Sequence, residues 1–183
     1  MNNSILLTIE LFMFITMEIN MSIKQNLSWD EYFMSLAIVA SLRSKDPNTK
    51  VGAVIVDSDN HVVATGYNGF IKGIDESKLS MRREGNWLDT KYPYICHAEI
   101  NCLLNSSVIS LKNTRLYCTL FPCNDCMKAI AQSGISEIIY LSDKHSCDDM
   151  YIASRKLLEL SGIAYRQLDT FSVSILINLL ENL

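Results

Sequence analysis

His97, Cys123 and Cys126 are the residues whose types and spacing best fit a metal site. Imidazole nitrogen and thiolate sulfur are donors that zinc prefers, and three protein ligands with an open fourth position are typical of catalytic zinc, whereas structural zinc usually has four. Glu99 follows His97 by two residues, which is too close for a comfortable fourth ligand but suitable for reaching a water on the metal. The pattern predicts a single zinc with Glu99 as general acid and base.

The two halves of this pattern are weak separately and strong together. Cys-x-x-Cys alone also occurs in redox pairs and in structural zinc sites. In the order Cys96-His97-Ala98-Glu99 and then Pro122-Cys123-Asn124-Asp125-Cys126, the two halves match the signature of zinc deaminases, in which the glutamate is not a metal ligand. We therefore favour a catalytic zinc site over a structural zinc or a redox dithiol.

Length and composition favour one globular domain. The chain has 183 residues, of which 49% are hydrophobic and 20% are charged; this suits a single core and excludes a disordered chain. The net charge of -4 argues against a long nucleic acid as partner, because such proteins usually present a basic surface. A single nucleotide remains compatible with this charge.

The remaining cysteines and histidines offer few alternative ligands. Besides His97 the chain contains only His61 and His145, and no histidine cluster suggests a second zinc. We expect the four cysteines outside the zinc motif to be reduced thiols, as in a cytoplasmic protein; they are Cys96, Cys102, Cys118 and Cys147.

The two ends of the chain differ from its middle. Glu10 and Glu18 interrupt the apolar residues of the first segment, which falls short of the ~20 needed to span a membrane. No Lys or Arg precedes Lys24, so the basic start of a signal peptide is missing. We expect residues 1–26 to be a dispensable extension and no membrane to be involved, with a membrane anchor as the alternative. Residues 171–183 are expected to pack on the domain.

Helix and strand patterns alternate between these ends. Ser28 and Glu31 form a capping box for a first helix, and a long polar connection from residue 69 to 94 separates an early hairpin from the metal motifs. Both metal motifs fall at helix N-termini, which favour thiolates. The predicted helices are 28–43, 97–103, 123–132 and 149–161, and the predicted strands are 51–56, 62–67, 114–119, 137–141 and 163–168. This order indicates an α/β fold with a mixed sheet and helices on both faces.

From about residue 27 to 168 the chain resembles the deoxycytidylate (dCMP) deaminase family, within the cytidine-deaminase-like fold. The similar stretches lie on both sides of the zinc motif as well as in it: 29–34 (WDEYFM), 43–48 (RSKDPN), 51–53 (VGA), 66–70 (GYNGF), 91–99 (KYPYICHAE) and 120–126 (LFPCNDC).

The resemblance implies a three-layer α/β/α fold with a five-stranded sheet in residues 27–170. It implies zinc-dependent hydrolysis of dCMP to dUMP and ammonia, which supplies dUMP for thymidylate synthesis. It further implies a homohexamer that is activated by dCTP, as a Mg²⁺ complex, and inhibited by dTTP. Asn68 and Gly69 lie in the loop that the family associates with effectors.

Two positions depart from the family pattern. Ile71 stands where the family usually has Pro in the effector loop, and His145 stands where a substrate-contacting Tyr is common. We expect His145 to stack on or hydrogen-bond to the substrate, or to be an ordinary loop residue. Asn68 is a candidate for contacting a sugar hydroxyl; alternatively it is a left-handed turn residue before Gly69.

The sequence leaves the phosphate contacts and the rival functions open. Arg43, Lys45 and Lys50 are candidates for the 5′-phosphate only because phosphate favours Arg and Lys. A tRNA adenosine deaminase would share the zinc motif but would need an RNA-binding face, which the net charge disfavours. A catalytically silent zinc protein, acting as a regulatory subunit or binding module, would have no use for Glu99.

Overall fold

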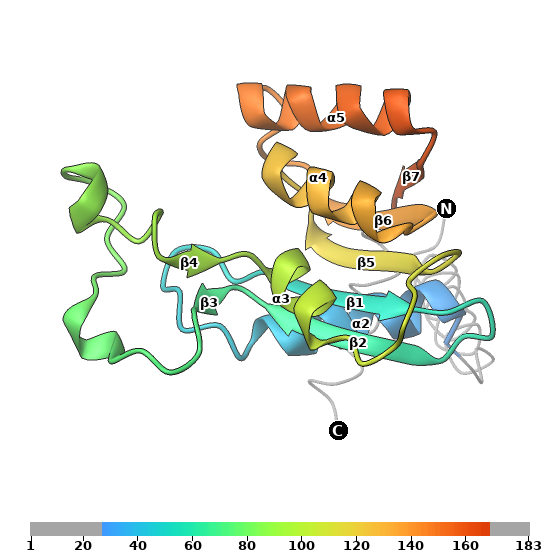
Figure 1. Cartoon of the computed structure of the whole chain (residues 1–183), viewed down its shortest axis with the longest axis horizontal. Helices are drawn as coiled ribbons and strands as arrows, with labels where there is room; N and C mark the ends of the chain where they lie inside the picture. Colours follow the sequence, from blue (N-terminus) through green and yellow to red (C-terminus); the bar gives the residue numbers. More distant parts are fainter. Residues whose placement is uncertain (1–26, 169–183) are drawn as a thin grey trace, which may run out of the picture.

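The computed structural model describes residues 27–168, which form a central sheet with helices on both faces (Figure 1). The predictions for residues 1–26 and for 171–183 lie outside the described residues. None of the helices within 27–168 has the length and apolar character that crossing a bilayer requires.

The central sheet has five strands in the order β2-β1-β5-β6-β7. It is mixed, since β1 is antiparallel to both β2 and β5, whereas β5, β6 and β7 run parallel to one another. The predicted hairpin and the predicted five-stranded mixed sheet are therefore confirmed. The strands are β1 (Gly52–Val56), β2 (Val62–Tyr67), β5 (Arg115–Leu120), β6 (Glu137–Ser142) and β7 (Ala164–Gln167).

Helix α2 (Trp29–Ser41) covers one face of the sheet, and its start follows from the capping box. The Ser28 hydroxyl accepts a hydrogen bond from the Glu31 N–H at 3.3 Å, and the Glu31 carboxylate accepts one from the Ser28 N–H at 2.8 Å. Phe33 and Met34 of α2 are fully buried in a core cluster with Tyr117 of β5. This cluster forms one of the two hydrophobic layers.

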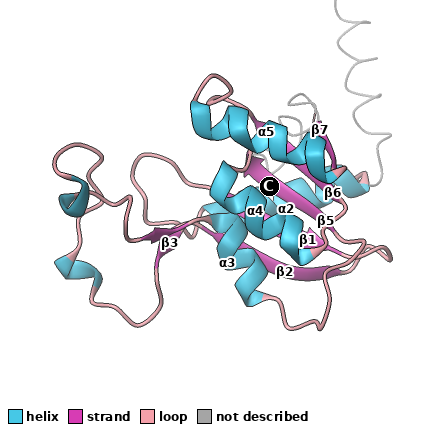
Figure 2. Ribbon diagram, turned by 45° about the horizontal axis from the view of Figure 1, so that its top comes forward, coloured by secondary structure: helices cyan, strands magenta, loops and turns pink. Residues whose placement is uncertain are grey.

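Helices α3 (Ala98–Asn105), α4 (Asn124–Ser133) and α5 (Asp149–Ser161) cover the opposite face (Figure 2). The second core cluster joins Cys102 of α3, Met127 of α4 and Leu158 of α5 to the sheet. Gly134 and Gly162 end α4 and α5 in the left-handed conformation, which glycine adopts readily after a helix. The predicted three-layer α/β/α architecture is confirmed.

Gly66 of β2 and Gly52 of β1 allow helices to approach the two faces of the sheet closely. A Cβ at Gly66 would overlap the backbone of Ala98 and Cys102 in α3, and one at Gly52 would overlap the backbone of Ala37 in α2. Since Ala98 lies between His97 and Glu99, Gly66 fixes the position of the helix that carries both.

The long connection after β2 is tied at its base by a two-stranded sheet. Strand β3 (Gly69–Phe70) pairs with β4 (Ile95–Cys96), which ends directly before His97. Between them, two short 3₁₀ helices (Glu76–Lys78 and Trp87–Asp89) lie on an arm that extends from the body (Figure 1). The sequence predicts a long polar connection over residues 69–94 but does not identify the two short strands at its base.

Candidate active site

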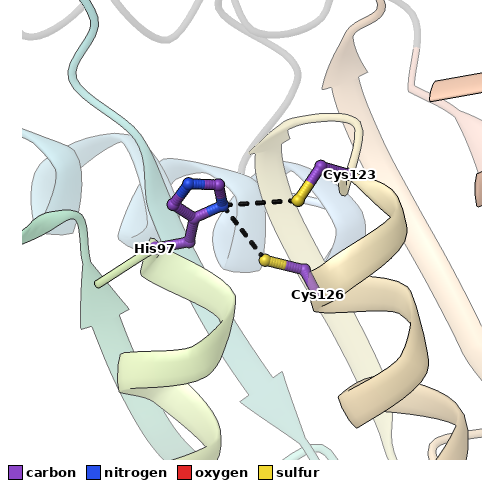
Figure 3. Close-up of side chains that lie close together, drawn as sticks. All are labelled: His97, Cys123 and Cys126. Atoms are coloured by element: carbon purple, nitrogen blue, oxygen red, sulfur yellow. Dashed lines mark hydrogen bonds between the residues drawn. The ribbon is translucent and has the colours of Figure 1, made fainter. Parts of the chain in front are cut away.

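The N-termini of α3 and α4 bring the predicted metal ligands together. His97 is the N-cap residue of α3 and Cys123 is the N-cap residue of α4, while Cys126 lies in the first turn of α4. Figure 3 shows the imidazole pointing at both sulfurs. The two cysteines are buried and the histidine is exposed on the cleft side, so the group has one open side.

The distances within this group fit a tetrahedral zinc ion. The His97 Nδ1 atom lies 3.4 Å from the Cys123 Sγ and 3.3 Å from the Cys126 Sγ. Zinc bonds of about 2.3 Å to sulfur and about 2.0–2.1 Å to nitrogen, at tetrahedral angles, place these atoms about 3.5 Å apart. The three donors could therefore hold zinc with little rearrangement, and the open side leaves a fourth position.

The interactions within this group favour one thiolate, on Cys123. The pKa of Cys123 is lowered to about 4, chiefly by the hydrogen bond with Cys126 and also by a hydrogen bond with His97, although burial opposes the shift. The same bond with Cys123, together with burial, raises the pKa of Cys126. One thiolate is thus favoured before metal binds, and zinc would release the proton that the pair retains.

Glu99 lies in the first turn of α3, where its side chain is almost completely buried. Burial is the largest cause that raises the pKa of this carboxyl group, whereas the His97 charge opposes the shift. A carboxyl group with a raised pKa can both accept and return a proton near neutral pH. The environment of Glu99 suits a proton carrier.

The metal group and Glu99 open onto a cleft of about 460 Å³. The cleft is lined by residues of the arm, including Trp87 and Tyr92, and by residues of the body, including Phe121 and Tyr151. Its size is within the range for small-molecule sites, and its lining combines aromatic side chains with charged and polar ones.

Asn68 lines the cleft, but most of its amide group is engaged with the protein. Its Oδ1 atom accepts a hydrogen bond from the Val51 N–H at 2.9 Å, and its Nδ2 donates to the Thr49 carbonyl at 2.9 Å and to Asp46 at 3.4 Å. One lone pair on Oδ1 is left for a ligand. The alternative prediction of a left-handed turn is wrong, because Asn60 and Asn113 are the described non-glycine residues with positive φ.

His145 also lines the cleft, from the loop before α5. Its ring stacks on Tyr151 at a centroid distance of 5.2 Å and an angle of 21° between the planes. Its Nδ1 lies 3.1 Å from the Asp148 carboxylate, which orients the ring. The prediction that His145 is a substrate contact stays a prediction, now with a defined position.

Several residues of the cleft were missed from the sequence. Tyr151 comes from α5, while Arg83 and Lys91 come from the arm; Lys91 forms a buried ion pair with Asp46. Tyr151 lies in the first turn of a predicted helix, but no local pattern marks it as a residue of the site. By contrast, none of Arg43, Lys45 and Lys50 lines the cleft.

The residues predicted for effectors lie beside the cleft. Gly69 of β3 is paired with Cys96, the residue before His97. Ile71, the departure from the family pattern, is exposed and lines a separate hollow with Pro93 and Tyr94 on the arm. Only Asn68 of the two predicted effector residues lines the cleft itself.

The mixed five-stranded sheet, with a His/Cys/Cys group at two helix N-termini and a buried glutamate beside it, defines the class of zinc-dependent nucleobase deaminases. The family model described as "Cytidine and deoxycytidylate deaminase zinc-binding region" matches residues 27–142. The chain belongs to this family.

Similar proteins come from animals and from a phage. Deoxycytidylate deaminase of Homo sapiens is 47% identical over 142 residues, covering 77% of this chain and 80% of the human protein. A probable deoxycytidylate deaminase of Drosophila melanogaster is 47% identical over 150 residues, covering 79% and 74%. The crystal structure of dCMP deaminase from cyanophage S-TIM5 in complex with dCMP and dUMP superimposes with a TM-score of 0.61 at 29% identity, covering 75% of this chain and 95% of the phage chain.

Proposed function

We propose that this protein is a dCMP deaminase, which hydrolyses dCMP to dUMP and ammonia and so supplies dUMP for thymidylate synthesis. The observation that carries the proposal is the His97, Cys123 and Cys126 group next to buried Glu99 in a nucleotide-sized cleft. The names of the human and phage relatives support dCMP as the substrate.

One zinc ion per subunit would be held by His97, Cys123 and Cys126, whose spacing fits it. When bound there, zinc supplies the activation of a water molecule at neutral pH. The thiolates of α4 and the imidazole of α3 would hold the ion at the cleft that Glu99 also lines. This arrangement requires both helices to keep their positions.

Glu99 carries the protons of the reaction. Its carboxylate takes one proton from the attacking water and gives it to N3 of the cytosine ring, while the water oxygen forms a bond to C4. The remaining proton of that oxygen passes through Glu99 to the amine on C4, the C4–N bond breaks, and ammonia leaves. The oxygen remains as the C4 carbonyl of dUMP, so atoms and charges balance.

The walls of the cleft would hold the nucleotide. His145, stacked on Tyr151, offers an aromatic surface for the base. The free lone pair of Asn68 Oδ1 can accept a hydrogen bond from a sugar hydroxyl. An Asn68→Ala variant tests this contact, because it removes the Oδ1 acceptor. We expect a higher KM for dCMP, and an unchanged KM would exclude the sugar contact.

A substrate panel tests the function. Zinc-loaded protein is incubated with dCMP, CMP, deoxycytidine, cytidine, dCTP and an adenosine-bearing RNA hairpin, and ammonia release is followed. We expect turnover to be highest on dCMP. Turnover confined to another compound of the panel would make that compound the substrate in place of dCMP. If folded protein with one zinc per subunit turned over none of them, the alternative of a catalytically silent zinc protein would be favoured.

We further propose that the protein is a cytoplasmic homo-oligomer, a hexamer by resemblance, regulated by nucleotides. Mg²⁺–dCTP would activate and dTTP would inhibit, with Asn68 and Gly69 in the effector site. The pairing of Gly69 with Cys96 supports a route from that site to His97, since a shift of β3 would move β4. Light scattering and the panel repeated with each effector test these two proposals.

We also propose that residues 27–170 form the deaminase domain, with 171–183 packing on it and 1–26 dispensable. A chain that starts at residue 27 is expected to keep the zinc content and the turnover of the full chain. Loss of either would assign a role to the first segment.

A further inference from the structure

We propose that Arg83, positioned by Tyr92, binds the 5′-phosphate of the nucleotide and thereby selects nucleotides over nucleosides. This inference rests on the proposed function, which requires a phosphate contact that the sequence did not locate. It assigns that contact to the arm between β3 and β4.

The charges around the cleft single out Arg83. The cleft is lined by two cationic side chains, Arg83 and Lys91. Lys91 is neutralised by Asp46 in a buried ion pair, with side chains that are 8% and 1% exposed. Arg83 is exposed and forms no ion pair within residues 27–168. It is therefore the cation of the cleft that is available to an anionic ligand.

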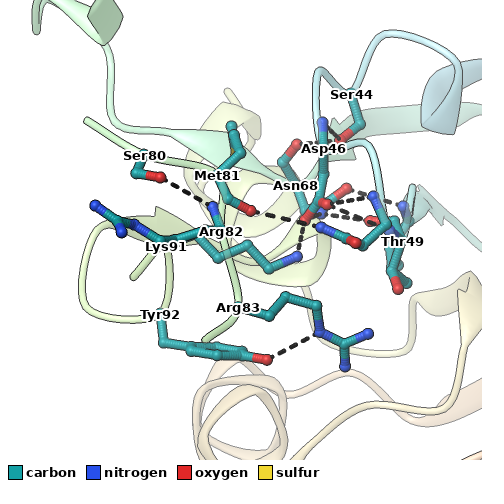
Figure 4. Close-up of polar contacts among 12 residues, drawn as sticks. Ser44, Asp46, Thr49, Asn68, Ser80, Met81, Arg82, Arg83, Lys91 and Tyr92 are labelled. Atoms are coloured by element: carbon teal, nitrogen blue, oxygen red, sulfur yellow. Dashed lines mark hydrogen bonds and ion pairs between the residues drawn. The ribbon is translucent and has the colours of Figure 1, made fainter. Parts of the chain in front are cut away.

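One hydrogen bond orients the Arg83 guanidinium and leaves its two Nη groups available to a ligand. The Nε atom donates a hydrogen bond to the Tyr92 hydroxyl at 3.1 Å (Figure 4). Within residues 27–168 this is the one hydrogen bond of the Arg83 side chain. The two Nη groups remain as donors. A guanidinium with two free parallel N–H groups matches a phosphate bidentately, which a lysine cannot do.

Tyr92 is itself held in place. Its ring stacks on Trp87 at a centroid distance of 6.1 Å and an angle of 5° between the planes. The backbone N–H of Lys91 donates to the Arg82 carbonyl at 3.1 Å, and the Lys91 side chain is anchored on Asp46. Arg83 therefore lies on a braced segment, so less conformational entropy is lost when it binds a ligand.

Arg82 provides a matched control within the same segment. It is also an exposed arginine, but it does not line the cleft. Figure 4 shows the two guanidinium groups on opposite sides of the view. A nonspecific effect of positive charge on the arm would be shared by both residues, whereas a phosphate contact would be specific to Arg83.

The test compares binding of dUMP and deoxyuridine by calorimetry in zinc-loaded wild type, Arg83→Gln and Arg82→Gln. We expect Arg83→Gln to weaken dUMP binding about 10- to 100-fold, the range for a charged hydrogen-bonding group. Deoxyuridine binding should not change, and Arg82→Gln should behave as wild type. Tyr92→Phe should weaken dUMP binding less than Arg83→Gln does, and Arg83→Lys should restore part of the loss.

Three results would overturn the proposal. These are unchanged dUMP binding in Arg83→Gln, an equal loss of dUMP and deoxyuridine binding, or an equal loss of dUMP binding in Arg82→Gln. Because binding of dUMP requires no turnover, the two proposals fail separately. Arg83-dependent dUMP binding by a protein that never deaminates dCMP would refute the proposed function and leave the phosphate contact standing.

Discussion

Lys91 and Asp46 form a buried ion pair although 45 residues separate them in the chain. Burial alone would raise the pKa of Asp46, but hydrogen bonds from Lys91 and from the backbone N–H groups of Asn48 and Thr49 hold it below its ordinary value. The pair joins the arm to the segment before β1. It thus fixes one wall of the cleft to the body of the domain.

Removing one partner of this pair should cost much more than breaking an exposed pair. Lys91→Met leaves the Asp46 charge buried, so we expect the free energy of unfolding to fall by about 3–5 kcal/mol. Lys45→Met is the control, because Lys45 and Glu76 pair at 2.8 Å with side chains that are 71% and 43% exposed; it should cost about 0–1 kcal/mol. Urea unfolding measures the free energy of unfolding of both variants. A similarly small loss in the two would show that the buried pair contributes no more to stability than an exposed one.

Gly66→Ala should damage the metal site from the opposite side of α3. The new methyl group would overlap the backbone of Ala98 and push the start of α3, with His97 and Glu99, away from the sheet. We expect a loss of about 1–3 kcal/mol in unfolding free energy, together with weaker zinc retention.

Gly52→Ala is the matched control for this variant, since it displaces α2 on the other face of the sheet. It should destabilise the fold and leave the zinc affinity of the folded protein unchanged. Equal zinc loss in the two variants would mean that close packing of α3 does not set the ligand geometry. Zinc is measured by competition with a chromogenic chelator.

Removing one ligand should release the metal. Cys123→Ala and His97→Ala leave two donors, so we expect less than one zinc per subunit after dialysis and a lower melting temperature. Cys147→Ala is the control, because Cys147 is an exposed free cysteine outside the metal group. Elemental analysis of the three variants decides: a full zinc ion in Cys123→Ala would remove that residue from the ligand set.

Acid should weaken the fold in part through Asp30. The Arg166 guanidinium is the largest cause that holds the pKa of Asp30 below 3.8, although burial opposes it. The folded-state pKa is lower than the unfolded one, so this stabilisation is present above pH 3.8 and is lost as the pH falls through the folded value.

Asp30→Asn should therefore be less stable than wild type at pH 7, and the difference should shrink below pH 3.8. Urea unfolding at several pH values measures the difference, in which zinc release cancels because it affects both proteins. Asp59→Asn, in the exposed turn between β1 and β2, serves as the control. A difference that stays constant with pH would mean that the Asp30 charge contributes nothing.

Much of the fold could be predicted because its signals are local. The Ser28 capping box and the apolar strand predicted at 51–56 each depend on a few neighbouring residues, and the structure has both. The grouping of His97 with the two cysteines could be predicted because the motif order is specific.

The rest of the site depends on contacts that no local pattern marks. Strands β3 and β4 have only two residues each, which is too short to show a strand periodicity, and residues 71–94 of the polar arm separate them. Arg83 sits in a stretch that reads as a solvated loop, and its place in the cleft follows from Tyr92 and from the buried Lys91. Only the folded chain reveals these relationships.

The role of Glu99 is tested most directly by measuring zinc content and dCMP turnover on the same preparations of wild type and Glu99→Gln. The amide keeps the shape of the side chain but cannot carry the protons. We therefore predict one zinc per subunit in both proteins and a loss of turnover of about 10²–10⁴-fold in the variant. Glu99→Gln with full zinc and near-wild-type turnover would contradict the assignment of Glu99 as the proton carrier.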